Sequence, residues 1–507
     1  MIGYEFLQSK VPLRMPPLDR PARVTSVTRI ERAETQLSIP KHAAPKDGAS
    51  ILDHALFALK HEPMQMALLH EAMKLVSIEA IGVALIGQPT SANLRRAAFI
   101  WEKSNNKEIP LTGTTTGGNY VDMFDKDDYY TGEVWEKSTR LRVNFNGIGP
   151  YSYCPVVQRD PALEKEGSDT LAALRVWATS PRNQEVLERV MNWAYLSETR
   201  DSYAIEKEVP SPTKEKAFLS AMEHLSERRP LTIDYLVGLQ NTVITEPYAA
   251  EAGIRSSQNW LQRGGHGSLS VRYVPPPPDA LGDLMDGFLK MANSRSTVPP
   301  LIKASLVSFG FVFLHPFIDG NGRLSRLLAH HSLNYSESLP DVGGSPAILP
   351  LSVAMKRSER IYLETLESFS KPARALWDVK FIDDGHFVFD FASSPMVYAS
   401  WSGDRAARFI TDCAKAALNE SLMDETAYIE AYDLVFDELD RKLDLPNKTI
   451  NLLIQWTYQN GGRMPEPRKN EDLMRMVKPA GFQLVETVIQ QHFGPLLEKA
   501  ANKHLTV

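Results

Sequence analysis

The sequence predicts a mainly α-helical protein that carries a small β-hairpin. Apolar residues recur at three- and four-residue spacing from Ser50 onward, as on the buried faces of amphipathic helices. Residues 299–315, PPLIKASLVSFGFVFLH, are apolar nearly all round, which is typical of a helix inside a core. Residues 257–273 change to a strand-like pattern around a Gly-Gly-His-Gly turn, which indicates a hairpin with a longer loop. A second hairpin is predicted in VKFIDDGHFVFDF, with its turn at Asp384-Gly385.

Four segments are expected along the chain. Residues 1–50 are rich in proline and arginine without a sustained period, and they predict an extended N-terminal arm. Residues 51–180 predict an N-terminal helical domain, and residues 181–370 predict a helical core that includes the first hairpin. Residues 371–507 predict a mainly helical C-terminal appendage.

Composition and charge argue against several classes of protein. The 507 residues are 43% hydrophobic and 23% charged, as in ordinary globular proteins of more than one domain. A net charge of −6 argues against bulk attraction to nucleic acid or to an anionic membrane surface. The two cysteines show no metal-binding spacing, and the N-terminus lacks the apolar run of a signal peptide. A cytoplasmic protein without a membrane partner is therefore expected.

One stretch, HPFIDGNGRLSR, concentrates groups suited to binding phosphate. Gly320 and Gly322 flank Asn321 just before a helix that is expected to start near Arg323. Glycines at a helix N-terminus let successive backbone N–H groups converge on an anion at the positive end of the helix dipole. Arg323 and Arg326 are three residues apart and share one helix face, from which each guanidinium can grip phosphate oxygens. The pattern therefore predicts a site for a di- or triphosphate.

The same stretch supplies an acid and a base. Asp319 would repel phosphates unless a cation lay between them, and Mg²⁺ held by one carboxylate and phosphate oxygens is the usual solution. His315, close to a magnesium ion and two arginines, is expected to be neutral near pH 7 and able to accept a proton. A base beside a polyphosphate can activate a hydroxyl for attack on phosphorus. These residues predict a nucleotidyl or phosphoryl transferase.

HPFIDGNGRLSR resembles the HPFx(D/E)GNGRxxR signature of the Fic (fido-domain) proteins, with every specified position matched. The resemblance implies a helical Fic core, preceded by a helper region, that transfers AMP from Mg–ATP to a protein hydroxyl and releases pyrophosphate. By position, it implies that His315 is the base and Asp319 the magnesium ligand. Gly320, Asn321 and Gly322 match the anion hole.

The resemblance also assigns the two arginines and an inhibitory segment. Arg323 matches the contact to the β-phosphate and Arg326 the contact to the γ-phosphate. DSYAIEKE resembles the inhibitory pattern (S/T)xxxE(G/N), in which Ser202 and Glu206 match while Lys207 replaces the usual glycine or asparagine. A Glu206 carboxylate paired with Arg326 would keep ATP in an unproductive pose. Glu208 competes with Glu206 for this assignment.

The predicted hairpin before VPPPP resembles the flap with which Fic proteins hold a target segment by strand addition. Main-chain pairing would align a target hydroxyl while demanding little of the target sequence. The flap residues expected to dock a protein substrate are Asn259, Trp260, Leu261, Val271, Arg272 and Tyr273.

Several alternatives stay open from the sequence. The enzyme could use another nucleotide, or it could remove AMP from a target with Glu206 orienting a water. A regulator that binds nucleotide or DNA without catalysis is a rival from another class, although an intact His315 and Asp319 speak against it. Self-modification and a homodimer are both compatible with the sequence.

Overall fold

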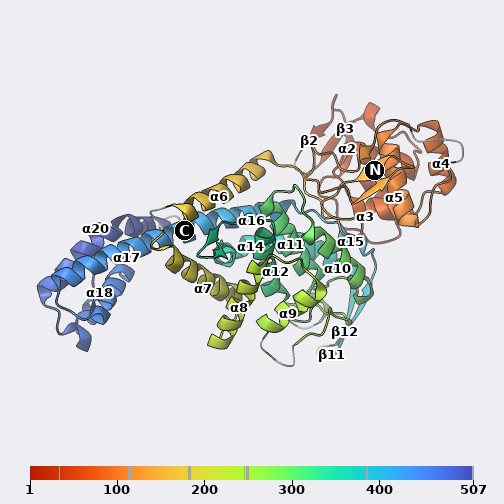
Figure 1. The fold of residues 1–507 in the computed structure, drawn as a ribbon. Helices are drawn as coiled ribbons and strands as arrows, with labels where there is room; N and C mark the ends of the chain where they lie inside the picture. The colour runs from red at the N-terminus through yellow and green to blue at the C-terminus, as the bar shows by residue number, and fades with distance from the viewer. Residues whose placement is uncertain are drawn as a thin grey trace. The chain divides into compact units, whose positions relative to one another are not determined.

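The computed structural model describes residues 1–33, 35–111, 117–180, 184–244, 246, 250–265, 267–383 and 386–504, without the side chains of 226 and 500–504. These residues form a mainly helical protein with a few short strands (Figure 1). The chain divides into two compact units. The first contains Met1–Ser168, Ser202–Ser338 and Met355–Asp412, and the second contains Asp169–Asp201, Leu339–Ala354 and Cys413–Val507. Each unit is made of three separate stretches of the chain. This division differs in kind from the four consecutive segments expected from the sequence, which it does not test as domains.

The expectation of an extended N-terminal arm is wrong. The structure places there a helix, a small mixed sheet and a short 3-10 turn: α1 (Gly3–Lys10), β1 (Ala22–Thr25), β2 (Glu31–Arg32), β3 (Leu37–Pro40) and η1 (Lys41–Ala43). Tyr4 and Leu7 are buried in the hydrophobic core of the helices that follow, and the Glu62 carboxylate accepts a hydrogen bond from the Tyr4 N–H at 2.9 Å. The apolar residues of this segment are too few to show a period, but they are enough to anchor it.

The helices predicted after Ser50 are present. They are α2 (Ile51–His61), α3 (Met66–Met73), α4 (Ile78–Gly87) and α5 (Ala92–Asn105). Ser50 caps α2 reciprocally with Asp53, and Ser77 caps α4. A small sheet follows, with strands β4 (Val121–Asp122), β5 (Glu136–Ser138) and β6 (Val143–Phe145), and α6 (Pro161–Thr179) comes next.

The central helices follow the predicted pattern closely. They are α7 (Leu187–Ile205), α8 (Pro212–His224), η3 (Leu225–Glu227), α9 (Ile233–Val243), α10 (Pro278–Asn293), α11 (Pro300–Leu314), α12 (Asn321–Tyr335), α13 (Leu351–Arg357) and α14 (Glu359–Arg374). Helix α11 is buried on nearly every side, as its composition predicts, and packs against α10 and α12 (Figure 1). It positions the loop that joins it to α12.

Both predicted hairpins are present. Strands β7 (Leu261–Gln262) and β8 (Val271–Tyr273) pair antiparallel, and so do β11 (Trp377–Asp383) and β12 (His386–Phe391). The predicted turn residues His266, Asp384 and Gly385 lie outside the described residues. The β-prone runs therefore form the strands that the alternation of their side chains predicts.

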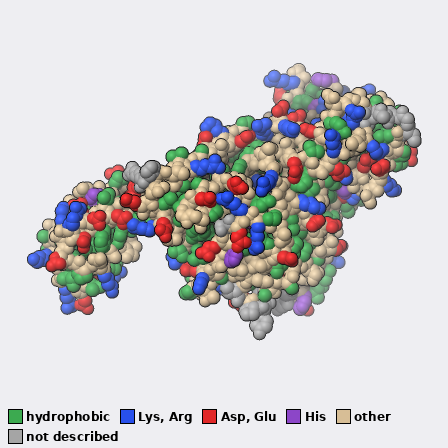
Figure 2. Space-filling view, viewed as in Figure 1, with side chains coloured by type: hydrophobic (Ala, Val, Ile, Leu, Met, Phe, Trp, Pro, Cys, Tyr) green, Lys and Arg blue, Asp and Glu red, His purple; other side chains and the backbone are tan. Residues whose placement is uncertain are grey.

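The second unit contains the helices at the end of the chain. A short pair, β9 (Asp341–Val342) and β10 (Ser345–Pro346), also belongs to this unit. After α15 (Met396–Ala399) and α16 (Asp404–Ala417) come η6 (Leu418–Leu422), α17 (Met423–Lys442), α18 (Asn447–Gln459), α19 (Glu466–Lys469), η7 (Asp472–Met474) and α20 (Pro479–His504). Helices α17, α18 and α20 share a core that includes Val435, Leu453 and Phe493. Figure 2 shows acidic and basic side chains interspersed on the visible face of these helices. No helix among the described residues has the length and apolarity needed to cross a membrane.

Candidate active site

The candidate base lies directly after the buried helix α11. His315 ends α11 as a left-handed cap with φ +49°, and its N–H donates to the Phe311 carbonyl at 2.9 Å. The ring atom Nδ1 lies 3.2 Å from the Val312 carbonyl oxygen. Because a carbonyl oxygen can only accept, Nδ1 carries the proton in this contact and Nε2 keeps its lone pair. His315 is thus arranged to accept a proton at Nε2.

Burial makes this histidine a weak acceptor that stays neutral. Desolvation lowers the pKa of His315 to about 4, opposed by the bond to Val312 and reinforced by the nearby Arg255 guanidinium. Arg255 was not among the site residues predicted from the sequence. Its backbone N–H donates to the Pro316 carbonyl at 2.8 Å, and its Nε donates to the His315 carbonyl at 2.9 Å. Arg255 therefore fixes the backbone of the loop that carries the base.

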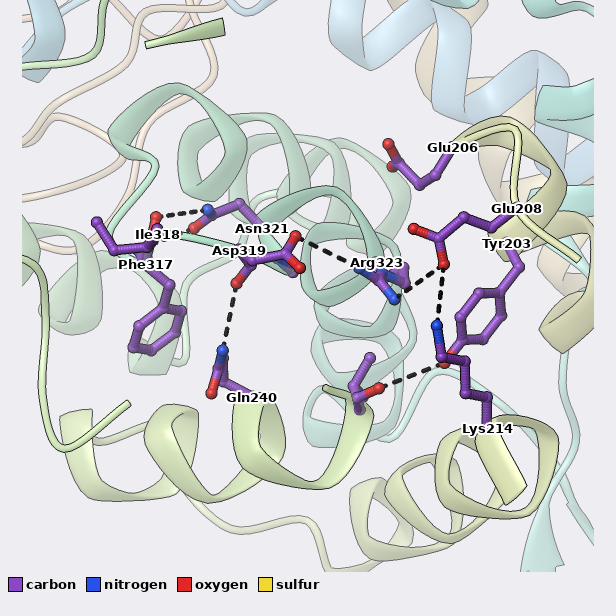
Figure 3. Close-up of polar contacts among 12 residues, drawn as sticks. Tyr203, Glu206, Glu208, Lys214, Gln240, Phe317, Ile318, Asp319, Asn321 and Arg323 are labelled. Atoms are coloured by element: carbon purple, nitrogen blue, oxygen red, sulfur yellow. Dashed lines mark hydrogen bonds and ion pairs between the residues drawn. The ribbon is translucent and has the colours of Figure 1, made fainter. Parts of the chain in front are cut away.

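The N-terminus of α12 begins two residues before the predicted position. Gly320 precedes it with φ +88°, a conformation that suits glycine. The Asn321 side chain accepts from the Phe317 N–H at 3.0 Å and donates to the Phe317 carbonyl at 2.8 Å, so it closes the loop on itself (Figure 3). At Gly322 an added Cβ would overlap the Glu206 carboxylate. A glycine is therefore needed where the Glu206 side chain approaches the backbone.

The carboxylate of Asp319 lies at the mouth of this loop. Its Oδ1 accepts from the Gly320 N–H at 2.6 Å and lies 3.4 Å from Arg323 Nη2, while the side chain is more than half exposed. Among the described residues, no group of three or more His, Cys, Asp or Glu side chains could hold a metal ion. A single accessible carboxylate fits Mg²⁺, which ordinarily takes one or two protein carboxylates and completes its shell with phosphates and water.

Each nitrogen of the Arg326 guanidinium donates a hydrogen bond to the end of α7. Its Nε donates to Ser202 Oγ at 2.8 Å, its Nη2 to the Ser202 carbonyl at 2.7 Å, and its Nη1 to Glu206 Oε1 at 3.0 Å. Arg326 and Ser202 are both buried, and Glu206 is partly exposed. Burial alone would lower the pKa of Arg326, but Glu206 together with Tyr362 raises it above its ordinary value. The structure thus brings together the three residues that the inhibitory pattern links.

The second arginine meets a different carboxylate. Arg323 Nη1 lies 3.7 Å from Glu208 Oε2, and its guanidinium lies over the Tyr203 ring, 5.1 Å from the ring centroid (Figure 3). Glu208, which competed with Glu206 in the sequence, therefore pairs with Arg323 and not with Arg326. Lys214, on α8, lies 3.5 Å from the same Glu208 oxygen. No short-range spacing in the sequence links Lys214 to Arg323.

Both glutamates come from one turn at the end of α7. The Glu208 N–H donates to the Tyr203 carbonyl at 3.1 Å, and the Lys207 N–H donates to the Ala204 carbonyl at 3.0 Å. These two bonds form a Schellman motif, whose turning residue takes left-handed geometry. Lys207 occupies that position with φ +62°. The usual glycine or asparagine at this place thus has a conformational reason, and lysine departs from it at a cost in strain.

The predicted flap residues divide into two groups. Val271 and Tyr273 are buried, and the Tyr273 hydroxyl donates to the Phe313 carbonyl. Asn259 donates to the Phe317 carbonyl at 2.9 Å, next to the candidate base loop. These three residues hold the flap to the core, and their predicted part in docking a target stays a prediction.

The remaining flap residues lie at or near the surface. Leu261 and Arg272 are exposed, and Trp260 packs on Phe387 and Phe389 of the second hairpin, with ring centroids 5.3 and 5.1 Å apart. Arg374 donates to the Val271 carbonyl at 3.1 Å, so the outer edge of β8 already has a partner there. Strand addition to this flap would therefore use β7.

Comparison with known proteins finds one matching family and several similar proteins. Residues 230–333 match the model of the Fic/DOC family. The chain is 35% identical over 128 residues to Protein adenylyltransferase Fic of Drosophila yakuba, and 34% identical to that of Drosophila melanogaster. Each match covers 25% of this chain and 23% of the relative, so the chain spans about a quarter of the length of these relatives.

Solved structures of similar proteins were also found. One is a Fic domain-containing signalling protein from Bacteroides thetaiotaomicron, at 16% identity and TM-score 0.37, over 51% of this chain and 95% of that one. Another is Fic-1 (residues 134–508) from C. elegans, at 15% identity and TM-score 0.35, over 75% of this chain and 88% of that one. The family match includes the whole of HPFIDGNGRLSR, α11 and all but the last two residues of α12. The similarity to the Fic/DOC family model thus lies in residues 230–333, which hold the candidate base and both arginines.

Proposed function

We propose that this chain is a protein adenylyltransferase that transfers AMP from Mg–ATP to a hydroxyl side chain of a protein. One observation carries the proposal: His315, whose Nε2 is free of a proton, lies in the loop that leads directly into α12. The N-terminus of a helix is suited to binding an anion. Arg323 and Arg326 rise from the first turns of that helix. The names of the similar Drosophila proteins support the same chemistry.

The proposed step exchanges one phosphorus–oxygen bond for another. The target hydroxyl oxygen attacks the α-phosphorus of ATP, and the bond from that phosphorus to the oxygen bridging the β-phosphate breaks. The hydroxyl proton passes to His315 Nε2, and pyrophosphate leaves. Arg323 and Arg326 bind the β- and γ-phosphates and stabilise the charge that develops on the leaving group. A positioned base of this kind contributes about 10²–10⁴ in rate.

Asp319 is the residue that would hold magnesium. The ion would neutralise phosphate charge and orient the leaving group. The carboxylate is already turned by the Gly320 N–H toward the mouth of the loop, so it can meet a magnesium ion without a rearrangement of α12.

The proposal includes autoinhibition by Glu206. Its carboxylate lies against Gly322 and takes the Arg326 guanidinium that would otherwise bind the γ-phosphate. A phosphate and this carboxylate carry the same sign of charge and need the same donors, so they compete. Transfer is therefore expected to be slow until Glu206 is displaced.

The test is a transfer assay on purified protein with magnesium and ATP labelled at the α- or the γ-phosphate. Wild type, Glu206→Gly and Glu206→Gly/His315→Ala are compared, with the exposed Glu79→Gln as a matched control. Self-modification with the α label should increase at least about tenfold in Glu206→Gly, because the charged hydrogen bond to Arg326 is gone. It should disappear in the double variant and remain at the wild-type level in Glu79→Gln.

Other results would redirect the assignment. Label retained from the γ position would show phosphorylation and overturn the proposal. Transfer from labelled GTP but not ATP would keep the mechanism and change the nucleotide. Loss of a protein-bound α label over time, faster with Glu206 present than absent, would favour removal of AMP as the main activity.

A further inference from the structure

The Glu208 carboxylate is held between two cations at distances longer than hydrogen bonds. Its Oε2 lies 3.7 Å from Arg323 Nη1 and 3.5 Å from Lys214 Nζ (Figure 3). This oxygen is buried and has no hydrogen-bond partner among the residues that the structure describes. A buried carboxylate oxygen normally accepts short hydrogen bonds, and one that does not is easily moved. Glu208 is therefore attracted by both cations and bound tightly by neither.

The arginine on one side of Glu208 is nearly inaccessible. The Arg323 side chain is 6% exposed, with Tyr203 beneath its guanidinium and Asp319 beside it. An anion that reaches Arg323 must therefore come close to Glu208, which repels it. The lysine on the other side belongs to α8 and lies farther out, 28% exposed.

We propose that Glu208 is a specificity-determining residue that competes with the β-phosphate of a nucleotide for Arg323, and that Lys214 receives the carboxylate when the phosphate binds. The inference rests on the proposed function, because it takes Arg323 as the β-phosphate contact. It differs from the pairing of Glu206 with Arg326, since it concerns the other arginine and the other phosphate. The Schellman turn after Ile205 delivers both carboxylates together.

This role of Glu208 predicts a difference between nucleotides with and without a β-phosphate. AMP has no β-phosphate, so its affinity should not depend on Glu208. ADP and ATP must displace the carboxylate, so their affinities should. The site would thereby release pyrophosphate more readily than two unopposed arginines would.

The experiment measures the binding of Mg–ADP and of AMP by calorimetry to full-length protein that carries His315→Ala, so that no transfer occurs. Glu208→Gln, a nearly isosteric change, should lower the Kd for ADP by about three- to tenfold, a modest effect because the pair is partly exposed. The Kd for AMP should remain unchanged. Glu79→Gln should change neither.

Variants of Lys214 test the proposal independently in the same binding experiment. Lys214→Ala should raise the Kd for ADP by about two- to fivefold while Glu208 is present, because the carboxylate then has only Arg323 as its partner. In Glu208→Gln/Lys214→Ala the Kd for ADP should equal that of Glu208→Gln alone. The exposed Lys216→Ala on the same helix is the matched control.

The outcomes separate this inference from the proposed function. If Glu206→Gly tightens ATP binding but Glu208→Gln leaves the affinity for ADP unchanged, the role of Glu208 is wrong and the proposed function stands. If the double variant binds ADP more weakly than Glu208→Gln, Lys214 contacts phosphate directly and its assigned role is wrong. If no variant binds ATP or ADP, both the proposed function and this inference fall.

Discussion

Two helix ends of opposite character meet at the candidate site. The N-terminus of α12 offers glycine N–H groups and the guanidinium groups of Arg323 and Arg326, which attract anions. The end of α7 offers the carboxylates of Glu206 and Glu208, which lie at the negative end of that helix and are unfavourable there. Each carboxylate becomes favourable only through the arginine that it meets. The α7 end is thus stabilised by the same two arginines that the proposed function assigns to the β- and γ-phosphates.

The sharpest way to separate the two ends is to remove the base alone. His315→Ala should lower transfer by about 10²–10⁴, since a positioned base contributes that much. Calorimetric affinity for Mg–ATP should stay within about twofold of wild type, because the phosphate contacts belong to α12. A parallel loss of affinity would contradict the division between base and phosphate site.

Acidification probes the burial of the base in the Glu206→Gly background. The base must be unprotonated, and burial lowers the pKa of His315 to about 4. The transfer rate should therefore be nearly level from pH 8 to about pH 6 and fall about tenfold per pH unit only below the lowered pKa. A fall that begins at the ordinary value of a histidine, near pH 6.5, would show that the base is solvated.

The same pKa has a consequence for stability. A histidine with a lowered pKa binds fewer protons in the folded than in the unfolded protein between about pH 4 and 6.5. Stability should therefore fall as the pH falls through that window. The slope of stability against pH should be smaller in His315→Ala, as measured by urea unfolding at several pH values.

On the α7 side, Ser202→Ala removes the acceptor of Arg326 Nε and leaves Glu206 in place. Self-modification should rise about three- to tenfold, less than in Glu206→Gly, because hydrogen bonds to charged groups are worth about 1.5–3 kcal/mol and two contacts to Arg326 remain. Ser202→Thr keeps the hydroxyl and should stay near wild type. Equal activation by both variants would mean that packing, not the hydrogen bond, holds the arginine.

The smallest change concerns the turn between the two glutamates. Lys207→Gly should raise the free energy of unfolding by about 1 kcal/mol, because left-handed geometry costs an L-residue about that much. The urea midpoint should increase with an unchanged slope, and self-modification should decrease as the α7 end becomes better ordered. Lys207→Ala keeps a Cβ and serves as the control that should not stabilise.

The sequence predicted what lies within short range along the chain. The loop from His315 to Arg326 is one continuous stretch, so its glycines, helix start and arginine face follow from local rules. The helices followed from their apolar periods, and both hairpins from alternation. The small N-terminal sheet was missed because its strands are only two to four residues long.

What the sequence could not predict depends on contacts across long separations. Arg255 reaches the His315 carbonyl from 60 residues away, and Lys214 meets Arg323 only through Glu208. The choice between Glu206 and Glu208 also needed the fold, because the turn at Lys207 decides which carboxylate meets which arginine. Residue spacing alone does not predict where the side chains point once the helix has ended in a turn.

The hydrogen bonds between the flap and the loop that carries His315 bear on which target hydroxyl could reach the base. Asn259 is bonded to the Phe317 carbonyl and Tyr273 to the Phe313 carbonyl, on either side of His315. The flap is therefore joined to the chain on both sides of the candidate base. If a target segment adds along β7, its position along the strand would set how far each of its hydroxyls lies from His315. The register of the added strand, more than the identity of its neighbours, would then select which hydroxyl is modified, and shifting an acceptor by a single position would turn it to the opposite face.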